Sequence, residues 1–312
     1  GKSATAVKDE DFVDKLFVAH THDTLLCFSD HGKLYWLKVY QLPQAGRGAR
    51  GKPIVNLLPL SEGERISAVL PIKEFEENKF VFMATSLGTV KKTSLTAFSR
   101  PRASGIIAVA LEPGDQLVGV AITDGARDIL LCTTAGKAIR FPEDEVRPMG
   151  REAAGVRGVK LGDDQKVNAL IVIDKGYILT ASANGFGKLT PIEDFPTHGR
   201  GGQGVIALQL TERNGAMVGA LQVSTDDEVM LMSQSGVLVR TPVSNISIVG
   251  RNTQGVRLIR LEEGDRLSGL ERIDGLVRED EALDDSGAEM GAGVAPTDSG
   301  SDVDGPETDG VP

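Results

Sequence analysis

Lysine and arginine recur in register along this chain, at intervals of about fifty residues. Each recurrence holds an apolar run, a polar turn with a glycine and a second run, as in VFMATSLGTVKKT (81–93), ILLCTTAGKAIRF (129–141) and VMLMSQSGVLVRT (229–241). A base stands three or four residues after four of the five turn glycines. Bases at regular intervals favour binding of a polyanion, because each neutralised phosphate releases condensed counterions.

A second basic signature follows each of these segments. It is an arginine, a few small residues, a glycine and a β-branched run, as in REAAGVRGV (151–159), RGGQGVIAL (200–208) and RNTQGVRLI (251–259). Together the two signatures give sixteen candidate phosphate-binding residues: Arg47, Arg50, Lys52, Lys91, Lys92, Arg100, Arg102, Lys137, Arg140, Arg151, Arg157, Lys188, Arg200, Arg240, Arg251 and Arg257.

The type of polyanion follows from the rest of the composition. Aromatic residues make up only 4% of the chain, which argues against a site that stacks single-stranded bases. A belt of bases on a curved surface suits duplex DNA, although bending a short duplex costs on the order of 1–6 kcal/mol that phosphate contacts must offset. The alternative is that these are ordinary solvated bases paired with acids of neighbouring turns.

Other residue types offer little chemistry. His20 and His22 form an HxH pair without a third metal ligand in view, so we expect no metal site. Cys27 and Cys132 each lie in an apolar run and are expected to be reduced thiols in the core. No Cys/His spacing typical of zinc and no Walker-type phosphate loop is present.

The elements that must position the bases are short strands. A third signature, an acidic or glycine turn followed by an apolar strand, closes each repeat, as in EPGDQLVGVAIT (112–123) and EEGDRLSGLERI (263–273). The runs are rich in Val, Ile, Leu and Thr and are bounded by Gly, Pro, Asn or Asp, which is the pattern of strands and turns. A β unit repeated at this period predicts a radial array of small sheets.

The repeats also predict the domain boundaries. EDFVDKLFVA (10–19) matches the third signature alone, so we expect residues 1–20 to be the end of one further repeat. Five complete repeats are then expected at approximately 21–72, 78–123, 127–173, 176–223 and 227–273, within one β domain of residues 1–277.

The remaining segment, residues 278–312, differs in composition. It holds eleven acids and one base, so it carries the whole formal charge of −10 and leaves the β domain neutral. With few large apolar residues it is expected to be a disordered acidic tail. We expect it either to compete with DNA for the basic belt or to act as a solubilising segment.

The chain resembles the C-terminal domain of bacterial DNA gyrase A. The resemblance lies in the long phrase at 10–72, in TTAGKAIRF (133–141) and in GRGGQGVIAL (199–208), and it extends over residues 1 to about 277. It implies an all-β fold, a six-bladed, propeller-like β-pinwheel whose blades exchange strands. It also implies wrapping of duplex DNA around a basic outer rim, which presents a DNA segment for strand passage so that the parent type IIA topoisomerase introduces negative supercoils with ATP.

The resemblance carries further expectations. The domain would have no cofactor of its own, whereas the parent enzyme uses ATP and Mg. Its partners would be duplex DNA, the remainder of gyrase A and gyrase B in a heterotetramer, with no membrane, a monomeric isolated domain and a cytoplasmic, nucleoid-associated location. The family's Gln-Arg-Arg-Gly-Gly-Lys-Gly box is not intact here, and without it we expect binding to persist while wrapping weakens.

No catalysis is expected of this chain. The family's cleaving tyrosine follows an arginine, whereas none of the three tyrosines here does: Tyr35, Tyr40 and Tyr177. Two alternatives remain open, a topoisomerase IV C-terminal domain and a β-propeller that serves as a protein-interaction platform. A single tryptophan speaks against kelch-like repeats.

Overall fold

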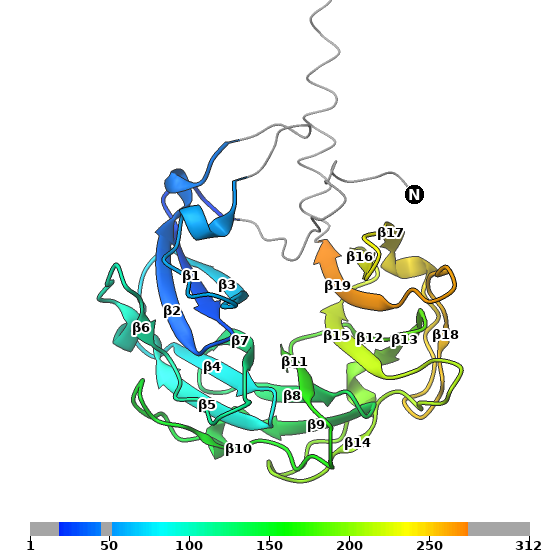
Figure 1. The fold of residues 1–312 in the computed structure, drawn as a ribbon. Coiled ribbons are helices and arrows are strands. Elements are labelled where there is room, and N and C mark those ends of the chain that lie inside the picture. The colour runs from blue at the N-terminus through cyan, green and yellow to red at the C-terminus, as the bar shows by residue number, and fades with distance from the viewer. Residues whose placement is uncertain (1–18, 45–51, 274–312) are drawn as a thin grey trace, which may run out of the picture. The chain divides into compact units, whose positions relative to one another are not determined.

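A computed structural model describes residues 19–44 and 52–273. Within these ranges the regular elements are strands and short 3₁₀ turns. The strands form five antiparallel sheets that follow one another in chain order (Figure 1). The chain divides at residue 275 into two units, and the second, residues 276–312, lies outside the described residues.

The first four sheets have the same four-stranded plan. Each holds an antiparallel hairpin, an inner strand on one side of it and a two-residue outer strand on the other. The first sheet comprises β3 (Ile66–Ile72), β1 (Thr24–Ser29), β2 (Lys33–Lys38) and β6 (Ile106–Ile107), in that order. The second comprises β7 (Leu117–Thr123), β4 (Phe80–Thr85), β5 (Thr89–Ser94) and β10 (Val156–Arg157).

The next sheets repeat this plan. The third comprises β11 (Val167–Val172), β8 (Asp128–Thr133), β9 (Lys137–Pro142) and β14 (Val205–Ile206). The fourth comprises β15 (Met217–Val223), β12 (Tyr177–Ser182), β13 (Phe186–Pro191) and β18 (Val256–Arg257). The fifth has three strands among the described residues, β19 (Leu267–Ile273), β16 (Glu228–Ser233) and β17 (Leu238–Pro242).

Each outer strand comes from the following repeat. β6, for example, follows the second hairpin in sequence but pairs with β2 of the first sheet. Short 3₁₀ turns stand between the elements: η1 (Val39–Gln41), η2 (Ile54–Asn56), η3 (Leu95–Phe98), η4 (Glu143–Glu145), η5 (Ile192–Asp194) and η6 (Val243–Asn245). The second basic signature therefore crosses to the preceding sheet before the chain turns back to its own.

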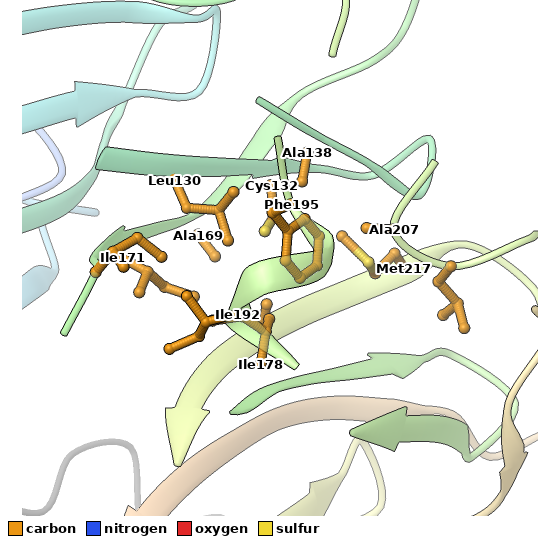
Figure 2. Packing of buried hydrophobic residues seen from close by; sticks show 13 residues of the cluster. Leu130, Cys132, Ala138, Ala169, Ile171, Ile178, Ile192, Phe195, Ala207 and Met217 are labelled. Atoms are coloured by element: carbon orange, nitrogen blue, oxygen red, sulfur yellow. The ribbon is translucent and has the colours of Figure 1, made fainter. Parts of the chain in front are cut away.

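The core lies in the seams between sheets. Leu130 and Cys132 of β8 pack with Ile178 of β12 and Met217 of β15, which belong to the next sheet (Figure 2). Alternate β8 residues, such as Leu131, pack instead against the preceding sheet. Inner strands of consecutive sheets are in contact, β3 with β7, β7 with β11, β11 with β15 and β15 with β19. Consecutive sheets that are apolar on both faces, pack face to face and bring their inner strands into contact form a β-propeller.

The prediction of six blades is wrong. The described residues form five sheets, because the chain supplies five sets of a hairpin followed by an inner strand. The sixth blade rested on EDFVDKLFVA (10–19), of which residues 10–18 lie outside the described ranges. A single strand without its hairpin does not make a further sheet.

Gly204 explains why the second signature needs a glycine before its β-branched run. Its φ is +77°, and a Cβ built there would lie 2.4 Å from the carbonyl oxygen of Ala138 on β9. Gly255 repeats the arrangement, with a φ of +77° and a Cβ position 2.6 Å from the carbonyl oxygen of Gly187 on β13. The glycine lets the exchanged strand approach the hairpin of the preceding sheet.

Candidate nucleic-acid interface

In each four-stranded sheet, the residue directly after the glycine of the hairpin turn lies opposite a residue of the outer strand. These two residues form one cross-strand pair. In the first sheet Lys33 lies opposite Ile107. In the second sheet the base is on the other strand, and Arg157 lies opposite Thr89. Directly opposed residues point to the same face of a sheet. The charge therefore occupies the same place in both sheets, although it comes from different strands.

The third and fourth sheets repeat this alternation. Lys137 lies opposite Ile206 in the third sheet. In the fourth, Arg257 lies opposite Phe186, and its guanidinium carbon stands 5.0 Å from the centre of the Phe186 ring. The face of an aromatic ring attracts a cation, so the contact steadies the long arginine side chain.

We name these four residues the rim bases: Lys33, Lys137, Arg157 and Arg257. The two arginines are exposed and the two lysines are half-buried. The ion pairs that the structure describes within residues 19–44 and 52–273 involve none of the four. Each of the first four sheets thus presents one cation in the same register.

The second-signature arginines have a different place. Arg200 is half-buried, and its guanidinium donates to the carbonyl oxygens of Glu145 at 3.1 Å and Arg157 at 2.9 Å. Arg251 likewise donates to the carbonyl oxygens of Asp194 at 3.1 Å and Ile206 at 2.6 Å. Each arginine links a 3₁₀ turn to the outer strand of the preceding sheet. They tie neighbouring blades together, beside the rim bases.

Three lysines of the predicted set are buried. Lys91, Lys92 and Lys188 are 1%, 4% and 0% exposed. The Lys92 ammonium donates to the carbonyl oxygen of Glu143 at 3.1 Å and stands 3.7 Å from the Glu143 carboxylate. Buried ammonium groups bound to protein oxygens do not reach a phosphate on the surface. We therefore leave these three lysines out of the contact set.

Two further arginines of the predicted set are paired within their own hairpins. Arg140 forms an ion pair with Asp128, at 2.9 Å between Nε and Oδ2, and its side chain is 18% exposed. It also donates to the carbonyl oxygens of Ile192 and Phe195, both at 3.3 Å. Arg240 pairs with Glu228. Arg140 thus links its hairpin to a turn of the next repeat, and Arg240 links the two strands of its own hairpin.

The remaining predicted residues divide into two groups. Lys52, Arg100 and Arg102 are exposed and Arg151 is half-buried. Arg47 and Arg50 lie outside the described residues.

Sequence reasoning missed Lys33. The signal was available, because Lys33 follows the turn glycine Gly32 directly, as Lys137 follows Gly136. The prediction relied instead on bases three and four residues after the glycine, and at those positions the side chains are buried or paired.

Two acids of the third signature, Asp115 and Asp265, bind turns. Asp115 accepts hydrogen bonds from the Ser86 hydroxyl at 2.9 Å and from the Leu87 backbone N–H at 3.0 Å. Asp265 accepts from the Ser235 hydroxyl at 2.6 Å, and this bond lowers the pKa of its carboxyl. These acids precede the inner strands, and their carboxylates bind the turn of the hairpin beside each inner strand.

Other kinds of site are not seen in the described part of the chain. Residues 19–44 and 52–273 contain no group of three or more His, Cys, Asp and Glu side chains that could hold a metal ion. Over the same ranges no helix is long and apolar enough to cross a membrane.

Comparison with known proteins bears on the repeated sheets. A family model described as "DNA gyrase C-terminal domain, beta-propeller" matches residues 23–73, 79–124, 127–174, 176–224 and 227–274. The chain belongs to this DNA gyrase C-terminal domain family. The five matched segments agree with the five sheets and with the correction of the six-blade prediction.

Sequences of DNA gyrase A are similar to almost the whole chain. DNA gyrase A of Salmonella typhimurium is 57% identical over 299 residues, a match that covers 95% of this chain and 34% of that protein. The chain thus spans about a third of the length of such curated relatives.

Two solved structures resemble the fold closely. The C-terminal domain of DNA topoisomerase IV matches with a TM-score of 0.76 and 28% identity, over 85% of this chain and 84% of that one. A DNA gyrase A C-terminal domain matches with a TM-score of 0.72 and 25% identity, over 82% of this chain and 84% of that one.

Proposed function

We propose that the outer strands of the blades bind duplex DNA without sequence preference and bend it along the row of rim bases. The observation that carries this proposal is the register of Lys33, Arg157, Lys137 and Arg257 on four consecutive sheets. The rim base lies on the hairpin in two of these sheets and on the outer strand in the other two. In all four it belongs to the cross-strand pair directly after the glycine of the hairpin turn. Regularly spaced cations match a regular array of phosphates better than any single pocket does.

The chemistry of these contacts is electrostatic. Lysine and arginine neutralise phosphates whatever the base sequence, and the affinity falls as salt rises because released counterions must be recaptured. Successive blades turn relative to one another, so a duplex that contacts several of them must bend. Each added contact offsets part of the bending energy.

Family membership supports the proposed role in a parent assembly. Together with the remainder of gyrase A and with gyrase B, the domain would present a bent DNA segment for strand passage, so that ATP-driven negative supercoiling results. In this proposal the chain itself binds DNA, needs no cofactor and performs no bond-making step. ATP and Mg belong to other parts of the enzyme.

Duplex binding by the 312-residue chain tests the proposal. Fluorescence anisotropy at low salt should give similar affinities for two duplexes of unrelated sequence, and weaker binding of one of their single strands. Fluorophores at the two ends of a duplex well below the persistence length of about 150 base pairs should approach each other on binding. Failure to bind either duplex at low salt would contradict the proposal and favour a protein-interaction platform.

A matched pair of variants locates the contact. Replacing the four rim bases by alanine should weaken binding strongly. The control removes four exposed bases that flank inner strands, Arg65, Lys73, Lys166 and Arg266, and so makes the same change in net charge. The control should retain most of the affinity, whereas equal losses in both variants would mean that net charge alone governs binding.

A further inference from the structure

Lys188 is a wholly buried cation at the third residue after the hairpin glycine. The three N–H groups of its Nζ are shared among four acceptors: the carbonyl oxygens of Gly250 at 2.8 Å and Thr253 at 3.1 Å, the Thr253 hydroxyl at 2.9 Å, and the carbonyl oxygen of Arg251. All these acceptors belong to the loop that leads into the outer strand β18. That strand carries the rim base Arg257.

Lys91 repeats this arrangement two sheets earlier. It is 1% exposed and donates to the carbonyl oxygen of Ala108 at 2.7 Å and to that of Arg151. Arg151 begins the loop that leads into the outer strand β10, which carries the rim base Arg157. In both sheets a buried ammonium from the hairpin holds a loop of the following repeat.

The other two sheets lack this lysine, and they place the rim base differently. The equivalent residues are Tyr35 in the first sheet and Ile139 in the third. Tyr35 donates its hydroxyl to Glu64 at 2.8 Å, and the Ile139 side chain lies near Gly202. In these sheets the rim base is on the hairpin itself, so its position depends less on where the exchanged loop lies.

The burial of these lysines needs a reason beyond packing. An ammonium that is removed from water must be compensated by acceptors, and an apolar residue fills the same position in the third sheet. Burial, and then the charge of Arg251, lowers the pKa of Lys188 to about 8. Burial and Arg151 do the same for Lys91, with Glu152 acting in the opposite direction. Both groups thus remain cations at neutral pH at an energetic cost.

We propose that Lys91 and Lys188 are positioning residues of the DNA interface, which fix the exchanged loops so that Arg157 and Arg257 stand in register with the rim lysines of the neighbouring sheets. This inference rests on the proposed duplex binding. It concerns the two sheets whose rim base arrives from another repeat. The lysines act through the loop backbone and do not touch DNA.

A double-mutant cycle on the 312-residue chain tests the inference. Lys188→Met removes the ammonium and keeps an unbranched side chain, and Arg257→Ala removes the rim base. Each single variant should weaken duplex binding by a similar factor and reduce the slope of log affinity against log salt by about 0.9, the value for one phosphate contact. The double variant should be no weaker than Arg257→Ala alone, because the lysine then has no rim base to position.

Ile139→Met provides the control, since it changes the equivalent residue of a sheet whose rim base lies on the hairpin. It should leave both affinity and salt slope unchanged. The cycle of Lys91→Met with Arg157→Ala repeats the test in the second sheet. If thermal unfolding shows that a methionine variant does not fold, Lys188→Gln retains two N–H donors and should show partial loss of affinity that disappears in the Arg257→Ala background.

The outcomes separate the two proposals. If Arg257→Ala leaves DNA affinity unchanged, the proposed contact is wrong. If Arg257→Ala weakens binding but Lys188→Met does not, the positioning role alone is wrong. If Lys188→Met weakens binding equally with and without Arg257, the lysine has a general structural role and the inference is overturned.

Discussion

Lysines of the hairpins have different environments according to their distance from the glycine of the hairpin turn. Lys137, one residue after Gly136, is half-buried at the rim, whereas Lys188, three residues after Gly185, is wholly buried. Positions one and three share a face of the strand. The exchanged loop covers the third position and leaves the first at its edge, so burial depends on the neighbouring repeat.

The buried lysines should make stability depend on pH. In the folded chain Lys91 and Lys188 release their protons near pH 8, compared with 10.5 for an ordinary lysine. Between these values the unfolded chain binds more protons, so their contribution to the free energy of unfolding rises with pH. Denaturant unfolding at pH 7 and pH 9 should show a larger increase for the wild type than for the Lys91→Met/Lys188→Met double variant. Equal increases in both proteins would contradict these shifted pKa values.

The two cysteines should be unreactive in the folded chain. Burial raises the pKa of the Cys27 and Cys132 thiols to about 12, and the thiolate is the reactive form. Alkylation at pH 8 should proceed only after denaturant is added, as followed by mass spectrometry. Rapid modification of either thiol in the native protein would contradict its burial in the core.

At the scale of elements, the exchanged outer strand governs both packing and the interface. It crosses to the preceding sheet, carries or opposes a rim base, and is anchored at its start by an arginine such as Arg251. The glycine of the second signature, such as Gly204, is the point at which this strand comes closest to the hairpin of the preceding sheet. A side chain introduced at this glycine should therefore lower the stability of the fold, although it leaves every charged residue unchanged.

Gly204→Ala and Gly202→Ala form a matched pair within one loop. Gly204 has a φ of +77° and no room for a Cβ, whereas a Cβ at Gly202 would meet nothing closer than the Ile139 side chain at 3.7 Å. Gly204→Ala should lower the free energy of unfolding by about 1–3 kcal/mol. Gly202→Ala should change it by less than about 0.5 kcal/mol, as measured by denaturant unfolding. Similar values for the two variants would contradict the close approach seen at Gly204.

The sequence predicts the hairpins well, but it does not predict which outer strand pairs with each hairpin. The run at 129–141 predicts a hairpin, and β8 and β9 occupy it. The sheet that RGGQGVIAL (200–208) joins cannot be predicted from local sequence, because β14 pairs with residues of β9 that lie about seventy positions earlier in the chain. For the same reason the buried state of Lys91 could not be predicted from spacing, whereas the place of Lys33 directly after Gly32 was a signal that the spacing did contain.

At the scale of the whole molecule, the proposed function depends on a pattern of charge. The formal net charge is −10, yet each of four consecutive sheets presents one rim base. The third-signature acids Asp115 and Asp265 accept hydrogen bonds from the hairpin turns, so these carboxylates are engaged within the protein. An overall negative chain can therefore bind a polyanion through local arrangement.

The salt dependence of duplex affinity tests this central claim most directly. For the wild type, the slope of log affinity against log salt reports the number of phosphates neutralised, at about 0.9 for each. Replacing Lys33, Lys137, Arg157 and Arg257 together by alanine should make the slope shallower by about 3.6, the equivalent of four contacts. A variant that folds as the wild type and keeps the same slope would contradict the account.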